Sequence, residues 1–231
     1  MTFFILGNHP ELSCAEIMAV IGKKTVTEKS ERVLLLEEVD ENLGVLQERL
    51  SGTIKIGRII GEVPDGNEQD MIEVIAMMVV EAAGKNKISF GISVYEMDET
   101  GRSRKLASRL NTLGLEIKKR VKETGRPVRY VSSKESALSS VIVEENDLLA
   151  SGGEYVLLVK TDGILIGQTE AVQPYKFWSQ RDYGRPARDA KSGMLPPKLA
   201  RMMINLSGVT PAGHILLDPF CGSGTGLMEA Q

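Results

Sequence analysis

The chain has 231 residues, of which 42% are hydrophobic and 26% are charged, and its net charge is -3 at pH 7. This is an ordinary composition for a soluble globular protein with a buried core, in one large domain or two to three small ones. No run of 18 apolar residues and no secretory signal pattern occurs, so neither a membrane span nor export is expected. The two cysteines, Cys14 and Cys221, lack CxxC spacing, and the two histidines lie far apart. We therefore expect a reduced cytoplasmic protein without a metal site.

The near-neutral total hides an uneven charge distribution. Residues 1–81 contain 7 Lys or Arg and 15 Asp or Glu, a net charge of -8. Residues 101–134 contain 11 Lys or Arg and 2 Asp or Glu, a net charge of +9. Residues 174–201 contain 7 Lys or Arg and 2 Asp or Glu, a net charge of +5. Such asymmetry indicates either a polyanionic partner or solvated helix faces balanced by acidic neighbours. Charge alone leaves both interpretations open.

The first 63 residues predict a compact β-α-β-β-α-β unit. Apolar side chains at helical spacing after Pro10 end at Gly22, which predicts a first helix. Alternating and β-branched stretches predict the strands. The predicted elements are strand Thr2–Leu6, helix Pro10–Ile21, strands Thr25–Glu28 and Arg32–Val39, helix Glu41–Leu50 and strand Thr53–Val63. This order is typical of a ferredoxin-like domain.

A turn at Pro64-Asp65-Gly66 precedes a second α/β unit over residues 64–169. Asp162-Gly163 is a strong hairpin signal between its last two strands. The predicted elements are helix Glu68–Ala82, strand Lys87–Tyr95, helix Arg104–Glu123, and strands Val128–Val131, Glu154–Lys160 and Gly163–Thr169.

The long helix of this unit combines an apolar stripe with a basic surface. Leu106, Leu110, Leu113, Ile117 and Val121 recur at steps of three and four, which predicts one buried face. The basic side chains around the stripe and just after it could contact RNA phosphates, or could be a solvated helix end that complements the helix dipole. The candidate RNA-binding residues are Arg104, Lys105, Arg109, Lys118, Lys119, Arg120, Lys122, Arg126 and Arg129.

Residues 170–193 predict a linker, because they mix Pro, Gly, Arg and aromatic residues without a clear period. Trp178 could stack on an unpaired base, but a buried anchor is the favoured interpretation for a large aromatic side chain. Arg185 and Arg188 are further candidates for RNA contacts or for contacts with the next domain. A helix over Met194–Leu206 and a short apolar strand over His214–Leu217 follow.

The strongest motif is Asp218-Pro219-Phe220-Cys221-Gly222-Ser223-Gly224-Thr225-Gly226, between the expected strand and an expected helix near Thr225. A ligand-binding loop belongs at this place in a doubly wound sheet. A Walker loop needs a Lys after the glycines, and a dinucleotide loop needs a third glycine where Leu227 stands. S-adenosylmethionine fits better, because it carries a cationic ammonium that Asp218 could pair with and no phosphate. A plain glycine-rich turn with a capping Asp is the alternative.

DPFCGSGT resembles the first S-adenosylmethionine motif of amino-group methyltransferases, and RDYGRPARDAKSGMLPPKLARMMINLSG resembles the segment ahead of it in tRNA (guanine-N2) methyltransferases of the archaeal, guanine-10 type. The resemblance implies a ferredoxin-like domain, a THUMP domain and the start of a Rossmann-like methyltransferase domain over residues 194–231. It implies tRNA as partner, with no DNA, and a monomer is expected. By resemblance, the residues lining the cofactor pocket are Asp218, Pro219, Phe220, Cys221, Gly222, Ser223, Gly224, Thr225, Pro197 and Lys198.

The chain departs from the family pattern at one point. The later [DN]-P-P-[YF] motif, which holds the target amine and stacks on its base, does not occur before Gln231. We therefore expect a truncated catalytic domain that is inactive alone, and the catalytic residues stay unknown. Two other functions remain open, an RNA-binding module without catalysis and an rRNA guanine methyltransferase.

Overall fold

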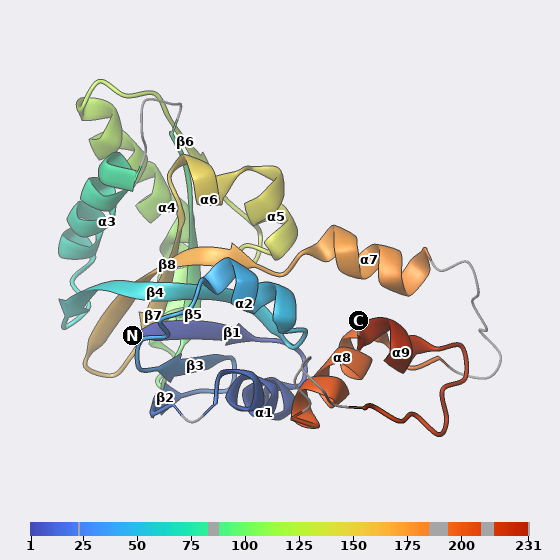
Figure 1. The fold of residues 1–231 in the computed structure, drawn as a ribbon. Helices are drawn as coiled ribbons and strands as arrows, with labels where there is room; N and C mark the ends of the chain where they lie inside the picture. Colours follow the sequence, from blue (N-terminus) through green and yellow to red (C-terminus); the bar gives the residue numbers. More distant parts are fainter. Residues whose placement is uncertain (23, 83–87, 185–193, 209–214, 231) are drawn as a thin grey trace.

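A computed structural model describes residues 1–22, 24–82, 88–184, 194–208 and 215–230 (Figure 1). Within them the fold is mixed α/β, with eight strands in a single sheet of order β2-β3-β1-β4-β8-β7-β5-β6. The strands are β1 Thr2–Leu6, β2 Val26–Lys29, β3 Val33–Leu36, β4 Thr53–Pro64, β5 Ile88–Glu96, β6 Val128–Val131, β7 Glu154–Val159 and β8 Gly163–Val172. The helices are α1 Pro10–Ile21, α2 Leu43–Arg49, α3 Glu68–Ala82, α4 Arg102–Glu123, α5 Ser140–Glu145, α6 Leu148–Ser151, α7 Tyr175–Tyr183, α8 Pro197–Leu206 and α9 Thr225–Glu229.

The sheet continues across the boundary between the two units that the sequence suggested. Strand β4 pairs with β1 on one side and with β8 on the other, both antiparallel. Strand β5 pairs in parallel with both β6 and β7, and the remaining pairs are antiparallel. The order of elements over residues 1–63 is the predicted β-α-β-β-α-β.

Helices cover the two ends of the sheet separately (Figure 1). The predicted stripe of α4 is buried and packs with α3 against Phe90 and Ile92 of β5, which confirms that prediction. Helices α1 and α2 form a second core with Phe4 of β1. Neighbouring residues of a strand point to opposite faces, so Phe3 and Ile5 belong to a third core with β7.

A buried ion pair connects the two halves of the sheet. Lys55 of β4 and Glu154 of β7 are both fully buried, and they contact each other directly. Lys55 also donates to the Leu138 carbonyl at 2.6 Å, and Thr169 of β8 donates to Glu154 at 2.8 Å. Because these hydrogen bonds satisfy both buried charges, removing one partner alone would leave the other charge uncompensated.

Several element boundaries differ from the predicted ones. The expected linker contains helix α7, which starts after Pro174 and ends at Tyr183, just before Gly184. Its only buried residue is Trp178, so no apolar stripe marks it in the sequence. Helix α8 starts at Pro197 rather than Met194, because a residue that precedes proline favours extended backbone, and Pro196 has ψ 137°. The short helices α5 and α6 carry too little periodicity to be predicted.

Candidate functional site

The glycine-rich loop turns sharply before α9. The Asp218 carboxylate accepts a hydrogen bond from the Phe220 amide at 2.9 Å, and the Gly224 amide donates to the Cys221 carbonyl at 2.7 Å. Gly222 has φ 48° and Gly224 has φ 80°, a left-handed conformation that residues with a Cβ rarely adopt. The position of these glycines in the motif therefore follows from the backbone, and α9 begins at Thr225 as expected.

The Asp218 carboxylate lies directly over the first turn of α9. A Cβ added at Gly226 would come within 2.7 Å of Asp218 Oδ2, while a Cβ at Gly224 would meet nothing within 4 Å. The Asp218 carboxylate therefore covers the loop at Gly226, whereas the space beside Gly224 is open. An acidic oxygen beside open glycine backbone can receive a ligand that carries an ammonium group.

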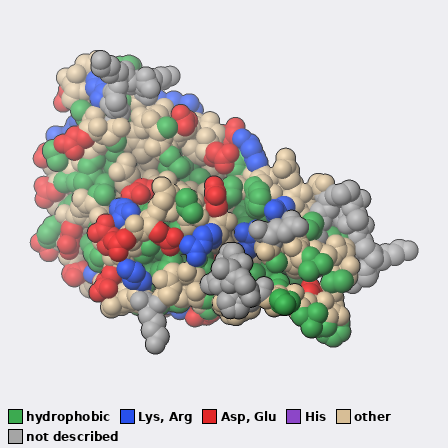
Figure 2. Space-filling view, viewed as in Figure 1, with side chains coloured by type: hydrophobic (Ala, Val, Ile, Leu, Met, Phe, Trp, Pro, Cys, Tyr) green, Lys and Arg blue, Asp and Glu red, His purple; other side chains and the backbone are tan. Residues whose placement is uncertain are grey.

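The strand expected at His214–Leu217 is not present in the part that the structure describes, so that prediction is wrong for residues 215–217, and His214 lies outside the described residues. A strand needs a hydrogen-bonded neighbour, and all eight described strands lie within residues 2–172. Ile215 and Leu217 are 94% and 82% exposed, and Phe220 is 91% exposed. Hydrophobic side chains accordingly gather at the lower right of Figure 2, in the region of α8 and α9.

A hollow of about 400 Å³ lies between α8 and the loop. Among the described residues that line it, Asp218 is the only charged one, and the others are apolar. The lining residues are Leu195, Ala200, Met203, Ile204, Leu216, Leu217, Asp218, Pro219, Phe220 and Gly226. One carboxylate in an apolar hollow suits a zwitterionic ligand with a hydrophobic body. The structure thus brings Asp218, Pro219 and Phe220 together with α8, while Cys221, Gly222, Ser223, Gly224 and Thr225 do not line the hollow.

Pro197 and Lys198 lie in a separate hollow of about 250 Å³ between α7 and α8. The Lys198 ammonium donates to the Gln173 side chain at 2.6 Å and lies 5.8 Å from the centre of the Trp178 ring. Burial lowers the pKa of Lys198 below its usual range. Trp178 is only 4% exposed, which confirms the interpretation of this residue as an anchor.

A buried carboxylate at the end of α9 holds that helix in place. Glu229 is fully buried and pairs with Arg181 of α7 at 2.8 Å and with Arg201 of α8 at 3.0 Å. Arg181 also donates to the Met228 carbonyl at 3.2 Å. These contacts fix the helix that follows the glycine loop to both neighbouring helices. The role of Glu229 was not predictable from the sequence, because nothing in a short acidic and apolar stretch distinguishes a buried carboxylate from an exposed one.

Helix α8 docks onto the N-terminal part of the chain through a second buried carboxylate. Glu16 of α1 is fully buried and accepts hydrogen bonds from the amides of Ser51 and Gly52 at 3.0 and 2.8 Å. Asn205 of α8 donates to Glu16 at 2.7 Å and to the Arg49 carbonyl at 2.9 Å. Glu16 and Asn205 are separated by 189 positions in the sequence, which explains why no local pattern predicts this contact.

The structure divides the candidate RNA-binding residues into two groups. Arg109 pairs with Glu68 at 2.8 Å, Arg120 pairs with Glu73 at 3.2 Å, and Arg126 donates to the Val80 carbonyl at 2.8 Å. Within the described part of the chain, no ion pair is found for the others, which are Arg104, Lys105, Lys118, Lys119, Lys122 and Arg129. Arg185 and Arg188 lie outside the described residues.

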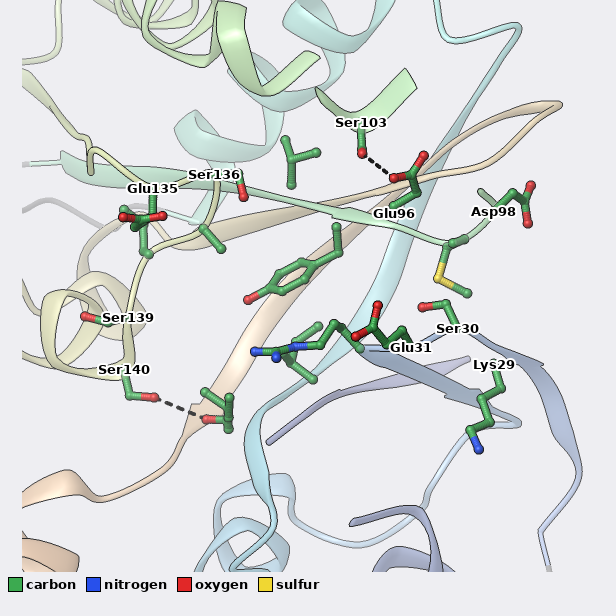
Figure 3. Close-up of a pocket in the computed structure, with 18 of the residues that line it drawn as sticks. Lys29, Ser30, Glu31, Glu96, Asp98, Ser103, Glu135, Ser136, Ser139 and Ser140 are labelled. Carbon is green, nitrogen blue, oxygen red and sulfur yellow. Dashed lines mark hydrogen bonds between the residues drawn. The ribbon is translucent and has the colours of Figure 1, made fainter. Parts of the chain in front are cut away.

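Another hollow, of about 1030 Å³, lies elsewhere, and most of its charged lining residues are acidic (Figure 3). Some of its acids already serve the fold, since Asp98 accepts from both the amide and the hydroxyl of Thr161 and Glu96 accepts from Ser103. The hydrogen bonds from Thr161 lower the pKa of Asp98. A polyanion such as RNA would be repelled by this lining.

Neither a metal site nor a membrane-spanning helix is found among the described residues. Among them, no group of three His, Cys, Asp or Glu side chains could hold a metal ion. None of the described helices is long and apolar enough to cross a membrane.

Comparison with known proteins connects the end of the chain to a methyltransferase family. Residues 185–231 match the UPF0020 family, described as "RMKL-like, methyltransferase domain". This match agrees with the domain type that the glycine motif predicted. Over 38 residues, 16% of this chain and 10% of the relative, the chain is 58% identical to the tRNA (guanine(10)-N2)-dimethyltransferase of Methanocaldococcus jannaschii.

Two further comparisons cover nearly the whole chain. It is 26% identical over 234 residues to the tRNA (guanine(10)-N2)-dimethyltransferase of Methanothermobacter thermautotrophicus, and it spans about 60% of the length of that relative. The crystal structure of TrmN from Thermus thermophilus has the same fold, with a TM-score of 0.54 and 16% identity over 99% of this chain and 60% of that one. The resemblance predicted from the sequence is confirmed to this extent: the chain is similar over its whole length to a curated tRNA (guanine-N2) methyltransferase.

Proposed function

We propose that this chain belongs to an S-adenosylmethionine-dependent methyltransferase that modifies the exocyclic 2-amino group of a guanosine in tRNA, at position 10. The observation that carries the proposal is the loop at Asp218–Gly224, whose carboxylate and left-handed glycines precede a helix within the segment that matches a methyltransferase domain. The curated relatives named for this reaction support the choice of substrate.

The proposal assigns a task to each part of the chain. Residues 1–63 form a ferredoxin-like domain, residues 64–169 a THUMP-like RNA-binding domain, residues 170–193 a linker, and residues 194–231 part of the methyltransferase domain. The unpaired cations of α4 contact the RNA backbone. The cytoplasmic location expected from the sequence stays a prediction.

In the cofactor site, Asp218 would bind the ammonium group of the amino-acid end, and the glycines would let the backbone pass close to the ligand. The apolar side chains that α8 contributes to the 400 Å³ hollow would exclude water. When bound, S-adenosylmethionine would supply the methyl group in a direct displacement: the guanosine nitrogen would form the new N–C bond as the S–CH3 bond breaks, with release of S-adenosylhomocysteine and of a proton from the amine. Orientation of the two reactants, rather than a strong base, supplies much of the acceleration in such a transfer.

The test uses the complete protein. Calorimetry with S-adenosylmethionine should show binding that Asp218→Ala weakens at least tenfold, because a charge-assisted hydrogen bond contributes about 1.5–3 kcal/mol. Mass mapping of treated tRNA should locate the new methyl groups on a guanosine at position 10. Binding of tRNA without any binding of S-adenosylmethionine would favour the alternative, an RNA-binding module without catalysis. Methylation of rRNA and not of tRNA would contradict the choice of substrate.

A further inference from the structure

A hollow of about 380 Å³ lies beside the first half of α4, away from the glycine loop. Its floor is closed by Tyr130 of β6, whose hydroxyl donates to the Leu110 carbonyl at 3.2 Å. Its rim is the segment 132–136 that follows β6. The lining residues are Ile92, Arg104, Ala107, Ser108, Leu110, Asn111, Tyr130, Ser132, Ser133, Lys134, Glu135 and Ser136.

The topology around this hollow is one that creates binding crevices. Strand β5 has a parallel neighbour on each side, β6 and β7. Helix α4 leads from β5 to β6 and packs against Phe90 and Ile92, on one face of the sheet. The segment with α5 and α6 leads from β6 to β7. Its Leu138 and Leu148 lie where a Cβ of Gly91 would be, which is on the face of the sheet opposite to Phe90 and Ile92. Where successive connections leave on opposite faces, a crevice opens at the carboxyl ends of the strands, and open α/β sheets bind ligands there.

The side chains at this crevice match an oxyanion. Arg104 and Lys134 are exposed, and in the described ranges neither has an ion-pair partner. The Ser133 hydroxyl accepts from the Glu135 amide at 3.1 Å, so its own proton is free to be donated. The Ser136 carbonyl accepts from the Val94 amide at 2.8 Å, which ties the rim to β5. Two cations with hydroxyl donors on an anchored rim are a combination that binds a phosphate group.

We propose that this hollow is a phosphate subsite that binds one backbone phosphate of the RNA through Arg104, Lys134 and Ser133. The inference rests on the proposed function for its choice of an RNA chain as the source of the phosphate. The site is separate from Lys118 and Lys119, because 14 residues of helix separate Arg104 from Lys118, about 21 Å along α4. The neighbouring acidic hollow would keep the RNA on the α4 side of segment 132–136 (Figure 3).

The first experiment uses inorganic phosphate as the probe. Titration into the complete protein should shift the NMR amide signals of residues 132–136, and the double variant R104Q/K134Q should lose these shifts. Both side chains are exposed, so the variant should fold normally, which its amide spectrum reports directly. Shifts that persist unchanged in the double variant would overturn the assignment.

The second experiment measures tRNA affinity against salt concentration. Removal of two phosphate-binding cations should lower the slope of log affinity against log salt by about 2. Glu135→Gln is the matched control on the same rim: it removes a negative charge from the lining and should tighten tRNA binding. An unchanged slope in R104Q/K134Q, or weaker binding in E135Q, contradicts the proposal.

The two proposals fail in different ways. If the wild-type protein transfers no methyl group but phosphate still shifts residues 132–136, the proposed function is wrong and the subsite stands. If methyl transfer is intact but the double variant keeps the wild-type salt dependence, the subsite is wrong and the proposed function stands.

Discussion

At Gly226 the missing Cβ leaves space for the Asp218 carboxylate, which we propose as a cofactor ligand. Its Cα lies in the first turn of α9, under the Asp218 carboxylate, and an added methyl group would lie 2.7 Å from Asp218 Oδ2. The atom in the way is the end of a short side chain that can rotate, so the backbone need not move. Glycine is therefore needed at position 226 to make space for the observed rotamer of Asp218, and not because the backbone adopts an unusual conformation there.

We predict that Gly226→Ala lowers the affinity for S-adenosylmethionine roughly tenfold without loss of stability. The methyl group turns Asp218 away from the ligand, while alanine in a helix is more stable than glycine by about 0.5–1 kcal/mol. Calorimetry and thermal unfolding measure the two effects. The control is Leu227→Ala on the same helix, since Leu227 is half exposed and does not line the 400 Å³ hollow. A lower melting temperature together with unchanged affinity would contradict the prediction.

Sequence reasoning succeeded at single residues where the chemistry is local. Trp178 is buried, as its size indicated. The left-handed backbone at Gly222 and Gly224 accounts for the glycines of the loop but was not predicted. Lys198 was grouped with the cofactor residues by resemblance, but its ammonium group is held by Gln173 in the hollow between α7 and α8. A side chain with four methylene groups can reach either side of its helix, so its direction depends on the tertiary structure.

Helices α7, α8 and α9 are held together by the buried Glu229 carboxylate between two guanidinium groups. Breaking such a pair is costly, because the remaining charges lose their compensation in a region with little water. The ion pairs of Glu229 with Arg181 and Arg201 hold α9 in place. They matter for the glycine loop because no described strand supports the loop before α9.

We predict that Glu229→Gln weakens binding of S-adenosylmethionine and lowers stability by about 2 kcal/mol, while tRNA affinity is unchanged. The matched control is Glu170→Gln, the same substitution in the pair with Arg58, whose carboxylate is 42% exposed. An exposed pair contributes only about 0–1 kcal/mol, so the control should behave like the wild type. Equal effects of the two substitutions on cofactor affinity would mean that Glu229 does not position the loop.

The basic residues of α4 allow ion-paired side chains to be compared with unpaired ones in RNA binding. We predict that charge reversal at Lys118 and Lys119 weakens tRNA binding and flattens its dependence on salt. Arg109→Gln and Arg120→Gln should have smaller effects, because Glu68 and Glu73 already neutralise these side chains. Filter binding at several salt concentrations measures both. If all four substitutions have the same effect, ion pairing does not select the RNA-binding residues.

Elements were predictable where their period is strong. The apolar stripe of α4 repeats over about four turns, so both the helix and its buried face were predictable. Helix α7 has one buried residue, so its sequence resembles a linker. The strand expected over residues 215–217 fails for a different reason: apolar composition favours a strand, but only a neighbouring strand supplies its hydrogen bonds.

At the scale of the whole molecule, the contact between α1 and α8 connects the two ends of the chain. Glu16 is shared by the turn at Ser51 and Gly52 and by Asn205 of α8. The turn satisfies the carboxylate even if α8 moves away, so the contact can be weakened without unfolding the N-terminal part.

We predict that Asn205→Ala increases the hydrogen-exchange rate of amides in residues 197–206 while the amides of β1 and β4 keep their protection. Asn146→Ala is the control, because the Asn146 side chain donates only to the Ile142 carbonyl one turn away. Its substitution should leave residues 197–206 unchanged. Faster exchange throughout the sheet of the Asn205 variant would show that α8 supports the whole fold.

The continuous sheet has a consequence for any attempt to divide this protein. Strands β4 and β8 are neighbours in the middle of it, so separating the two halves at Pro64 would expose two long rows of unpaired peptide groups. Bare strand edges recruit other chains, and each half expressed by itself should self-associate. Two segments that the sequence suggests as separate domains should therefore unfold and be degraded together.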